Sequence, residues 1–216
     1  YKPRAMELQC STLVIGSGIA GLVYALNMAA HGPVIIITKR EASESNTRYA
    51  QGGIAAVTSL EDSFEQHIAD TLRSGDGLCH ADVVQQIVTE APGQIQQLMR
   101  WGVQFALTAN DEFELTQEGG HSQRRILHSG DATGLVIEQA LLAAIKKHPN
   151  ITLLEQHIAV NLITADRIQA SAAKRCIGAY VLDIKNTRIL TIAAQVTMLA
   201  TGGAGKVYLY TTNPDI

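Results

Sequence analysis

The stretch STLVIGSGIAGLVYALNMAA, residues 11–30, decides the fold of this 216-residue chain. Residues 11–15 form a short apolar run typical of a buried strand, and residues 19–30 are apolar and alanine-rich, which indicates a helix. The run PVIIIT at 33–38 follows and is apolar throughout, as in a parallel strand covered on both faces. Strand, glycine turn, helix and strand in this order predict a βαβ crossover.

Between the first strand and the helix lies the pattern G-x-G-x-x-G, formed by Gly16, Gly18 and Gly21. The first glycine allows a tight turn, the second lets a pyrophosphate approach the backbone, and the third lets the helix pack close to the strand. Free N–H groups and the positive end of the helix dipole then favour phosphate. The position between strand and helix predicts a dinucleotide site, with a purely structural glycine turn as the alternative.

The identity of the dinucleotide stays open from spacing alone. In NAD-binding proteins an acidic residue about 20 positions further on binds the ribose hydroxyls. Here the second strand ends at Thr38-Lys39-Arg40, and the first acid is Glu41. This weakens the NAD interpretation. Lys39 is compatible with an NADP phosphate or with a different contact to ribose and phosphate.

The rest of the chain predicts an α/β, Rossmann-type domain with a central parallel sheet and an added antiparallel β-meander from about residue 151. Asn186 is expected to turn a hairpin in the meander. Short strands and loops are expected over 102–128. Helices are expected from Asp62 to about Arg73 and from Asp131 to His148. A further helix is expected from Ala81 or Asp82 to about Trp101, with an interruption at Pro92-Gly93. Strands are expected over 151–163 and 176–200.

Composition excludes several classes of protein. A net charge of -3 gives no electrostatic footprint for nucleic acid or an anionic membrane, and 46% hydrophobic residues exclude a disordered chain. Cys10, Cys79 and Cys176 stand far apart, which argues against a disulfide framework or zinc site and favours a reducing compartment. With no apolar targeting segment and no apolar run long enough to span a bilayer, we expect a cytoplasmic protein.

Further motifs bring in a family resemblance. The chain resembles the flavoprotein family of succinate dehydrogenase and fumarate reductase, and within it the branch that oxidises L-aspartate. The combination of E-G-G-H-S, R-R-I-L-H and D-A-T-G, together with T-T-N-P-D-I, carries the resemblance to that branch. The motifs are GSGIAG at 16–21, AQGGI at 50–54, EGGHSQRRILH at 118–128, DATG at 131–134, ATGGAG at 200–205 and TTNPDI at 211–216.

The resemblance implies a chemistry. FAD takes a hydride from a carbon next to a carboxylate, which converts L-aspartate to iminoaspartate in the first step of NAD biosynthesis from aspartate. Oxygen or fumarate is the implied electron acceptor, quinolinate synthase a possible functional partner, and no nucleic acid or membrane is involved. The alternatives are a soluble fumarate reductase or succinate-oxidising flavoprotein and a non-catalytic FAD-binding module. A pyridine-nucleotide dehydrogenase ranks lower.

One departure from the family concerns the link to the flavin. In succinate dehydrogenase, a histidine four residues before the alanine of A-Q-G-G is joined covalently to the flavin. This sequence has Asn46 at that position. No covalent link can form there, so we expect FAD to be bound non-covalently.

The resemblance also assigns cofactor contacts. Lys39 resembles the contact to the adenosine side, and the A-Q-G-G glycines resemble a backbone that approaches the flavin ring without a Cβ in the way. Ile158–Val160 resemble the segment that packs on adenine, with plain core as the alternative. The residues expected to bind FAD are Gly16, Ser17, Gly18, Ile19, Ala20, Gly21, Lys39, Ser45, Asn46, Thr47, Arg48, Tyr49, Ala50, Gln51, Gly52, Gly53, Ala159, Val160, Ala200, Thr201 and Gly202.

On the substrate side, the resemblance places Glu118 opposite the substrate ammonium. A carboxylate there would favour aspartate and repel a dicarboxylate that has no amine; the alternative is a solvated loop acid. His121 and Ser122 are expected to hydrogen-bond the flavin or to order the loop. Arg124 and Arg125 could attract a dicarboxylate, but such pairs more often make surface or backbone contacts. His128 is expected to be structural.

Members of this family are considerably longer than this chain. They continue into a capping domain and a helical region that supply the residues gripping the substrate carboxylates. We therefore expect residues 1–216 to form the amino-terminal FAD-binding domain, without the capping and helical domains. The isolated chain is expected to turn over poorly, because the capping domain completes the site.

Overall fold

The computed structural model describes residues 6–169 and 173–213. Pro214, Asp215 and Ile216, which end the T-T-N-P-D-I motif, lie outside the described residues. The chain forms two compact units: a first unit of Tyr1–Arg48 with Leu141–Ile216, and a second unit of Tyr49–Ala140. Among the described residues, no helix combines the length and apolar character that crossing a bilayer requires.

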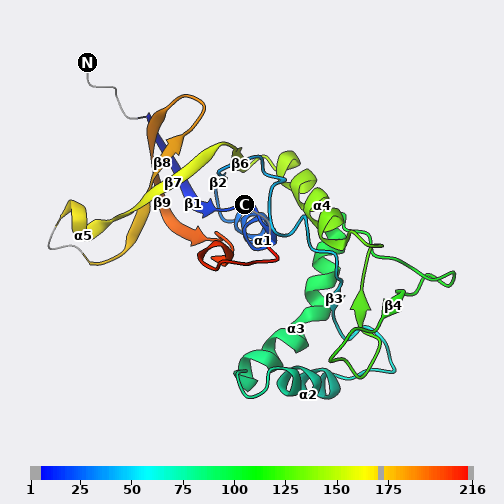
Figure 1. Cartoon of the computed structure of the whole chain (residues 1–216). Coiled ribbons are helices and arrows are strands. Elements are labelled where there is room, and N and C mark those ends of the chain that lie inside the picture. The colour runs from blue at the N-terminus through cyan, green and yellow to red at the C-terminus, as the bar shows by residue number, and fades with distance from the viewer. Residues whose placement is uncertain (1–5, 170–172, 214–216) are drawn as a thin grey trace. The chain divides into compact units, whose positions relative to one another are not determined.

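The first unit is built on a six-stranded sheet with the order β6-β2-β1-β9-β8-β7 (Figure 1). Helix α1 connects the parallel neighbours β1 and β2, so the predicted βαβ crossover is confirmed. The pairs β1–β9 and β2–β6 are also parallel, whereas β7, β8 and β9 pair antiparallel as the predicted meander. The bounds are β1 Met6–Ile15, α1 Ile19–Met28, β2 Val34–Ile37, β6 Ile151–Leu154, β7 His157–Thr164, α5 Ala165–Ile168, β8 Cys176–Asp183, β9 Arg188–Leu199 and the 3-10 turn η1 Gly205–Val207.

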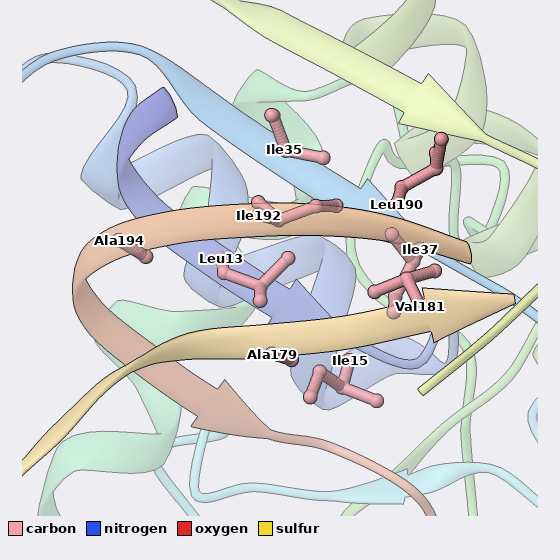
Figure 2. Packing of buried hydrophobic residues seen from close by; sticks show 9 residues of the cluster. All are labelled: Leu13, Ile15, Ile35, Ile37, Ala179, Val181, Leu190, Ile192 and Ala194. Carbon is pink, nitrogen blue, oxygen red and sulfur yellow. The ribbon is translucent and has the colours of Figure 1, made fainter. Parts of the chain in front are cut away.

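The core of the first unit lies between the parallel strands and the meander (Figure 2). Side chains alternate along a strand, so Leu13 and Ile15 of β1 point to the same face and pack with Val181 of β8. Val14 and Ile36 have no exposed surface and point to the opposite face, where α1 contacts β1 and β2. Burial of each such side chain contributes about 1.5–3 kcal/mol. Both faces of β1 and β2 are therefore covered, as their continuous apolar sequence predicts.

The segment predicted as strand over 151–163 is divided between two places in the sheet. β6 pairs with β2, whereas β7 pairs with β8 at the other end of the strand order. Gln156, with a φ of 59°, turns the chain between them. The His157 N–H then donates to the carbonyl of Thr38 at 2.8 Å. The start of β7 is therefore held against the end of β2.

The hairpin between β8 and β9 forms at Asn186, as predicted. The Asn186 backbone N–H and side-chain amide donate to the two carboxylate oxygens of Asp183, at 3.1 and 2.8 Å. Hydrogen bonds from Asn186 first, and then from Arg188, lower the pKa of Asp183 to about 2, although burial opposes them. The Asp183 carboxylate is therefore held ionised and fixes the turn.

The second unit contains two helices and a small antiparallel sheet. Ser63 caps α2 by accepting a hydrogen bond from the Gln66 N–H, so the helix begins two residues after the predicted Asp62. The three strands have the order β3-β5-β4. The bounds are β3 Ile54–Ala55, α2 Phe64–Ser74, α3 Ala81–Arg100, β4 Leu115–Thr116 and β5 Ile126–Leu127; α4, Thr133–Lys147, begins in this unit and ends in the first.

The predicted interruption of the second helix at Pro92-Gly93 is wrong. Helix α3 is continuous and contains Pro92 in its interior. A proline inside a helix costs about 3 kcal/mol. Val88 before it and Ile95 and Leu98 after it are all buried, and burial of three such side chains outweighs that cost. Packing on both sides therefore keeps the helix in one piece.

Candidate functional site

Two glycines of the G-x-G-x-x-G turn are required by packing within the first unit. Gly16 has a φ of +117°, and a Cβ added there would lie 2.1 Å from the Ala200 carbonyl oxygen. A Cβ added at Gly21 would lie 2.1 Å from the Gly16 carbonyl oxygen. The turn after β1, the start of α1 and the end of β9 therefore approach more closely than any side chain allows.

Gly18, the second glycine of the turn, differs from the other two. A Cβ added at Gly18 would meet only Thr47 Oγ1, at 3.6 Å, which is ordinary van der Waals contact. Gly18 precedes α1 and gives it no side-chain cap, while the Ile19 N–H donates to Thr47 Oγ1 at 3.0 Å. No contact among the described residues requires glycine here, so the space beside Gly18 is available to a ligand at the positive end of α1.

Beside this turn the first unit has a cleft of about 470 Å³. It lies where β1, β2 and β9 end at their carboxyl sides, the position at which doubly wound sheets bind ligands. It brings together segments that are distant in sequence but were predicted to bind the cofactor. These are Gly16, Ser17, Gly18, Ile19, Ala20, Lys39, Ser45, Asn46, Thr47, Ala159, Ala200, Thr201 and Gly202.

Three predicted residues of the first unit do not line the cleft. Gly21 serves the packing of α1 instead of lining the cleft, and Val160 is 57% exposed at a register irregularity in β7. Arg48 ends the first of the two segments that form this unit and does not line the cleft either. The sequence prediction missed Glu44 and His157, which do line it. Proximity to a strand end was an available signal for His157, which begins β7, but not for Glu44, which lies in the loop between β2 and β3.

Polar side chains fix the loop that follows β2. Ser17 is buried, and its Oγ lies 3.0 Å from both Thr38 Oγ1 and the Ala42 carbonyl oxygen. The Ala42 N–H donates to Glu155 Oε1 at 2.7 Å. The Ser17 hydroxyl is thus engaged within the protein, which leaves its backbone to face the cleft. The cleft therefore fits a dinucleotide diphosphate. Its rim is the hydrogen-bonded loop after β2, and it offers the free space beside Gly18, the start of α1 and the exposed cation of Lys39.

The A-Q-G-G motif lies in the second unit, together with the Glu118 loop. A Cβ added at Gly53 would lie 2.2 Å from the Leu127 carbonyl oxygen, so this glycine is required by packing against β5. A Cβ added at Gly52 would have Glu118 Oε1 as its nearest neighbour, at 3.8 Å. The Ala50 carbonyl accepts a hydrogen bond from the Gly134 N–H at 3.0 Å. Three motifs separated in sequence therefore meet here, and Tyr49, Ala50, Gln51 and Gly52 are solvent-exposed.

Glu118 and His121 belong to one turn. The His121 N–H donates to the Glu118 carbonyl at 3.2 Å, and Gln117 Nε2 donates to the His121 carbonyl at 2.8 Å. Glu118 is exposed, whereas the half-buried His121 ring lies 5.6 Å, centroid to centroid, from the ring of His67. The turn thus presents a carboxylate to solvent beside Gly52.

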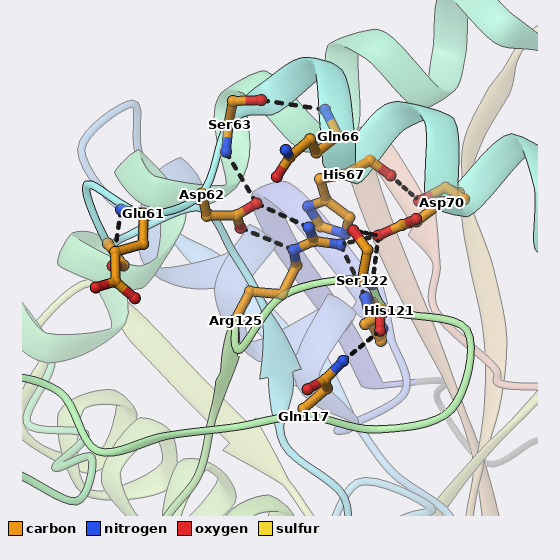
Figure 3. Close-up of polar contacts among 12 residues, drawn as sticks. Glu61, Asp62, Ser63, Gln66, His67, Asp70, Gln117, His121, Ser122 and Arg125 are labelled. Atoms are coloured by element: carbon orange, nitrogen blue, oxygen red, sulfur yellow. Dashed lines mark hydrogen bonds and ion pairs between the residues drawn. The ribbon is translucent and has the colours of Figure 1, made fainter.

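A buried ionic network lies next to this turn (Figure 3). Arg125 has no exposed surface, and its Nε and Nη2 donate to the two carboxylate oxygens of Asp62 at 2.8 and 2.7 Å. Its Nη1 donates to Asp70 Oδ2 at 2.7 Å and lies 3.2 Å from His121 Nδ1. The idea that Arg125 attracts a dicarboxylate is wrong, because carboxylates of the protein already occupy it. The exposed Arg124 makes a backbone contact, with Nη1 3.4 Å from the Leu115 carbonyl.

The pKa values of the network residues favour the ionised carboxylates and guanidinium. Burial alone would raise the pKa of Asp62 and Asp70, but hydrogen bonds outweigh burial and lower both. For Asp62 these bonds come from Arg125 and Ser63, and for Asp70 from Ser122, Arg125 and Arg73. Hydrogen bonding to Asp62 raises the pKa of Arg125. Burial first, and then the charges of Arg125 and His121, lower the pKa of His67. The network therefore combines ionised carboxylates and guanidinium with a neutral His67.

Comparison with known proteins supports the interpretation of the cleft as a dinucleotide site. Residues 11–216 match the family described as FAD binding domain. The chain is 49% identical over 204 residues to L-aspartate oxidase 1 of Ralstonia nicotianae, covering 94% of this chain and 38% of that protein. It is 48% identical over 215 residues to L-aspartate oxidase of Vibrio cholerae, covering 97% and 40%. A solved quinol fumarate reductase of E. coli matches with a TM-score of 0.88 at 30% identity, covering 97% of this chain and 35% of that one.

These matches agree with the predicted fold and with FAD as the cofactor. The chain spans about two fifths of the length of these two curated relatives. The aligned part contains the glycine turn, the A-Q-G-G motif and the Glu118 loop.

Proposed function

This chain belongs to the FAD binding domain family, and from that membership we propose that it is the FAD-binding part of an enzyme that oxidises L-aspartate to iminoaspartate. The observation that carries the proposal is the position of the Glu118 carboxylate, whose Oε1 would lie 3.8 Å from a Cβ at Gly52 of the A-Q-G-G motif. In this proposal residues 1–216 act as one FAD-binding domain. Oxygen or fumarate accepts the electrons, and a quinolinate-forming enzyme consumes the product.

The first unit would hold the adenosine diphosphate portion of FAD. When bound, FAD supplies the acceptor for the hydride that leaves the carbon next to the substrate carboxylate. Gly18 would admit the diphosphate to the start of α1, where the positive end of the helix dipole favours its charge. Thr47 accepts from the Ile19 N–H and so holds the loop of Ser45 and Asn46 against the helix start. Lys39 adds a cation at the rim.

We propose that the link to FAD is non-covalent, because Asn46 stands where a flavin-linked histidine would be required. The side chain of Asn46 lines the cleft, and its carboxamide has no nucleophile that could attack a flavin methyl group. We also propose a cytoplasmic location, supported by three cysteines that are all free thiols.

Substrate selection would depend on Glu118. An ammonium group about 4 Å from a carboxylate gains about 1 kcal/mol in water and about 4 kcal/mol near a protein surface. Succinate lacks the ammonium group and adds only negative charge, so the same carboxylate repels it. Glu118 is therefore expected to favour L-aspartate over succinate at least about fivefold. The exposed loop position and the neighbouring Gly52 leave room for a ligand beside the carboxylate.

A second candidate function is the oxidation of succinate or reduction of fumarate, which the similarity to quinol fumarate reductase favours. The two candidates differ in the role of Glu118. An enzyme for succinate gains nothing from a carboxylate that repels its substrate, so the Glu118→Gln change should leave succinate oxidation unchanged or improve it. A non-catalytic FAD-binding module would bind FAD and react with neither compound.

A hybrid enzyme tests these functions. Residues 11–213 of this chain would replace the matching segment of the Vibrio cholerae relative, and flavin absorbance would be followed without oxygen after addition of L-aspartate or succinate. The proposal predicts bleaching by L-aspartate, and a loss of preference for L-aspartate in the Glu118→Gln variant. Glu114→Gln, an exposed acid in the same segment, is the matched control and should keep the preference. A hybrid that binds FAD, is reduced by dithionite and is not reduced by L-aspartate would contradict the proposal.

A further inference from the structure

We propose that Asp70 is a positioning residue, which holds the Glu118 turn through Ser122 and Arg125 and so sets the preference for a substrate with an ammonium group. The selectivity part of this inference rests on the proposed function. Asp70 itself lies on α2, is 4% exposed and bonds Ser122 and Arg125, not Glu118. Its effect on a substrate would therefore be indirect.

The contacts of Asp70 join α2 to the loop. Asp70 Oδ2 accepts from the Ser122 backbone N–H, from the Ser122 hydroxyl and from Arg125 Nη1, each at 2.7 Å. Its other oxygen, Oδ1, accepts from Arg73 Nη2. The two loop residues lie 52 and 55 positions away in sequence. One buried carboxylate therefore fixes the backbone of the loop at Ser122 and two of its side chains, Ser122 and Arg125 (Figure 3).

Apart from Asp70, few side chains outside the turn that carries Glu118 hydrogen-bond to this turn. Gly119 and Gly120 follow Glu118, and Gly120 has a φ of +88°. A Cβ at Gly119 would meet nothing within 4 Å. Glycines give the backbone the greatest freedom, so this segment depends on what holds its ends. At the end that follows the glycines, the first strong anchor is the pair of hydrogen bonds from Ser122 to Asp70.

The charge balance explains why a carboxylate suits this role. Hydrogen bonds to an ionised acceptor are about twice as strong as those between neutral groups. Arg125 compensates the buried charges of Asp62 and Asp70, and Arg73 adds an exposed cation that bonds the other carboxylate oxygen of Asp70. The network thus keeps Asp70 ionised, which strengthens both bonds to Ser122. A purely structural ion pair would stabilise the unit without controlling the mobility of the Glu118 turn, and this difference can be measured.

Amide hydrogen exchange of the FAD-loaded chain gives the first readout, which does not depend on activity. Asp70→Asn weakens all the bonds from the loop, and Ser122→Ala removes only the hydroxyl bond, so the fold survives in at least the second variant. Exchange over residues 117–122 is expected to accelerate about tenfold in Asp70→Asn and about threefold in Ser122→Ala. Ser63→Ala is the matched control: it removes the cap of α2, which costs comparable stability, but within the described part of the chain the Ser63 Oγ bonds only the Gln66 N–H. Exchange in the loop should not change in this control.

The hybrid enzyme gives the second readout. The ratio of kcat/KM for L-aspartate to that for succinate is expected to fall about tenfold in Asp70→Asn and less in Ser122→Ala, and to stay unchanged in Ser63→Ala. Unchanged exchange in both loop variants would overturn the inference. So would equal acceleration in the control, or faster exchange with an unchanged ratio. If L-aspartate does not reduce the wild-type hybrid, the proposed function fails, and the exchange experiment still decides whether Asp70 holds the loop.

Discussion

Gly16 lies directly against Ala200: a Cβ added at Gly16 would come within 2.1 Å of the Ala200 carbonyl oxygen. This contact joins the end of β1 to the end of β9, and both ends line the cleft. Gly18, two residues further on, has only Thr47 Oγ1 near its Cβ position, at 3.6 Å. The two glycines of one motif therefore serve different purposes, the first for the fold and the second for the ligand.

Alanine substitutions at these two glycines should distinguish the role of Gly16 in folding from the role of Gly18 in ligand binding. Gly16→Ala should destabilise the chain by at least about 2 kcal/mol, because the new Cβ clashes with backbone and the residue is strained at positive φ. Gly18→Ala should leave the free energy of unfolding nearly unchanged and weaken FAD binding at least about tenfold. Urea unfolding and a fluorescence titration with FAD measure the two effects. Equal loss of stability in both variants would contradict this division.

Acidification should destabilise the second unit in two pH ranges. The folded-state pKa values of Asp62 and Asp70 lie below the usual 3.8, so their contribution is complete above that pH and is lost as the pH falls further. The folded-state pKa of His67 lies below 6.5, so stability also falls as the pH drops through that value. Asp70→Asn should reduce the pH dependence of the urea midpoint below pH 3.8, whereas the exposed control Asp111→Asn should keep it. Identical acid profiles in all three proteins would exclude this role of the network.

Arg125 and Arg124 form a natural pair of test and control. Arg125→Met leaves two buried carboxylates without their cation and should cost about 3–5 kcal/mol in free energy of unfolding at neutral pH. Arg124→Met removes an exposed neighbour and should change stability by less than about 0.5 kcal/mol. Adding Asp62→Asn and Asp70→Asn to Arg125→Met should restore part of the loss. Denaturant unfolding measures all three values, and a cost for Arg125→Met no larger than that of Arg124→Met would refute the buried pairing.

Helix α3 offers a stabilising change. Gly93 lies inside the helix beside Pro92, and a Cβ added there would meet nothing within 4 Å. Gly93→Ala should therefore raise the free energy of unfolding by about 0.5–1 kcal/mol, because alanine loses less backbone entropy in a helix. Thermal unfolding followed by circular dichroism measures the gain. A lower melting temperature would show that α3 is interrupted at this point after all.

The parts of the fold predicted from sequence are those encoded by local pattern. The strand and helix around Gly16–Gly21 carry their own periodicity and turn signals, and the structure confirms them within a few residues. The β8–β9 hairpin at Asn186 is local in the same sense. The division of 151–164 between two edges of the sheet was not predicted, because strand partners are chosen by tertiary packing. Continuity of α3 through Pro92 depends likewise on burial of residues that a local rule ignores.

The candidate site shows the same limit. Motif spacing and the family resemblance predicted most residues that line the cleft, but missed others, among them Glu44 in the loop after β2 and His157 at the start of β7. Sequence could not tell which of two adjacent arginines is buried, because that depends on Asp62 and Asp70, more than fifty residues away. No local signal marks a carboxylate on α2 as the partner of Ser122.

The visible absorption spectrum of the purified chain, recorded before and after acid precipitation, tests the central claim most directly. The claim is that the cleft beside Gly18 binds FAD without a covalent link, since Asn46 replaces the linking histidine. A two-banded flavin spectrum that moves completely into the acid supernatant is the predicted result. Flavin that stays with the precipitated protein would contradict non-covalent binding, and a chain that stays colourless even after incubation with FAD would contradict the cleft as the cofactor site.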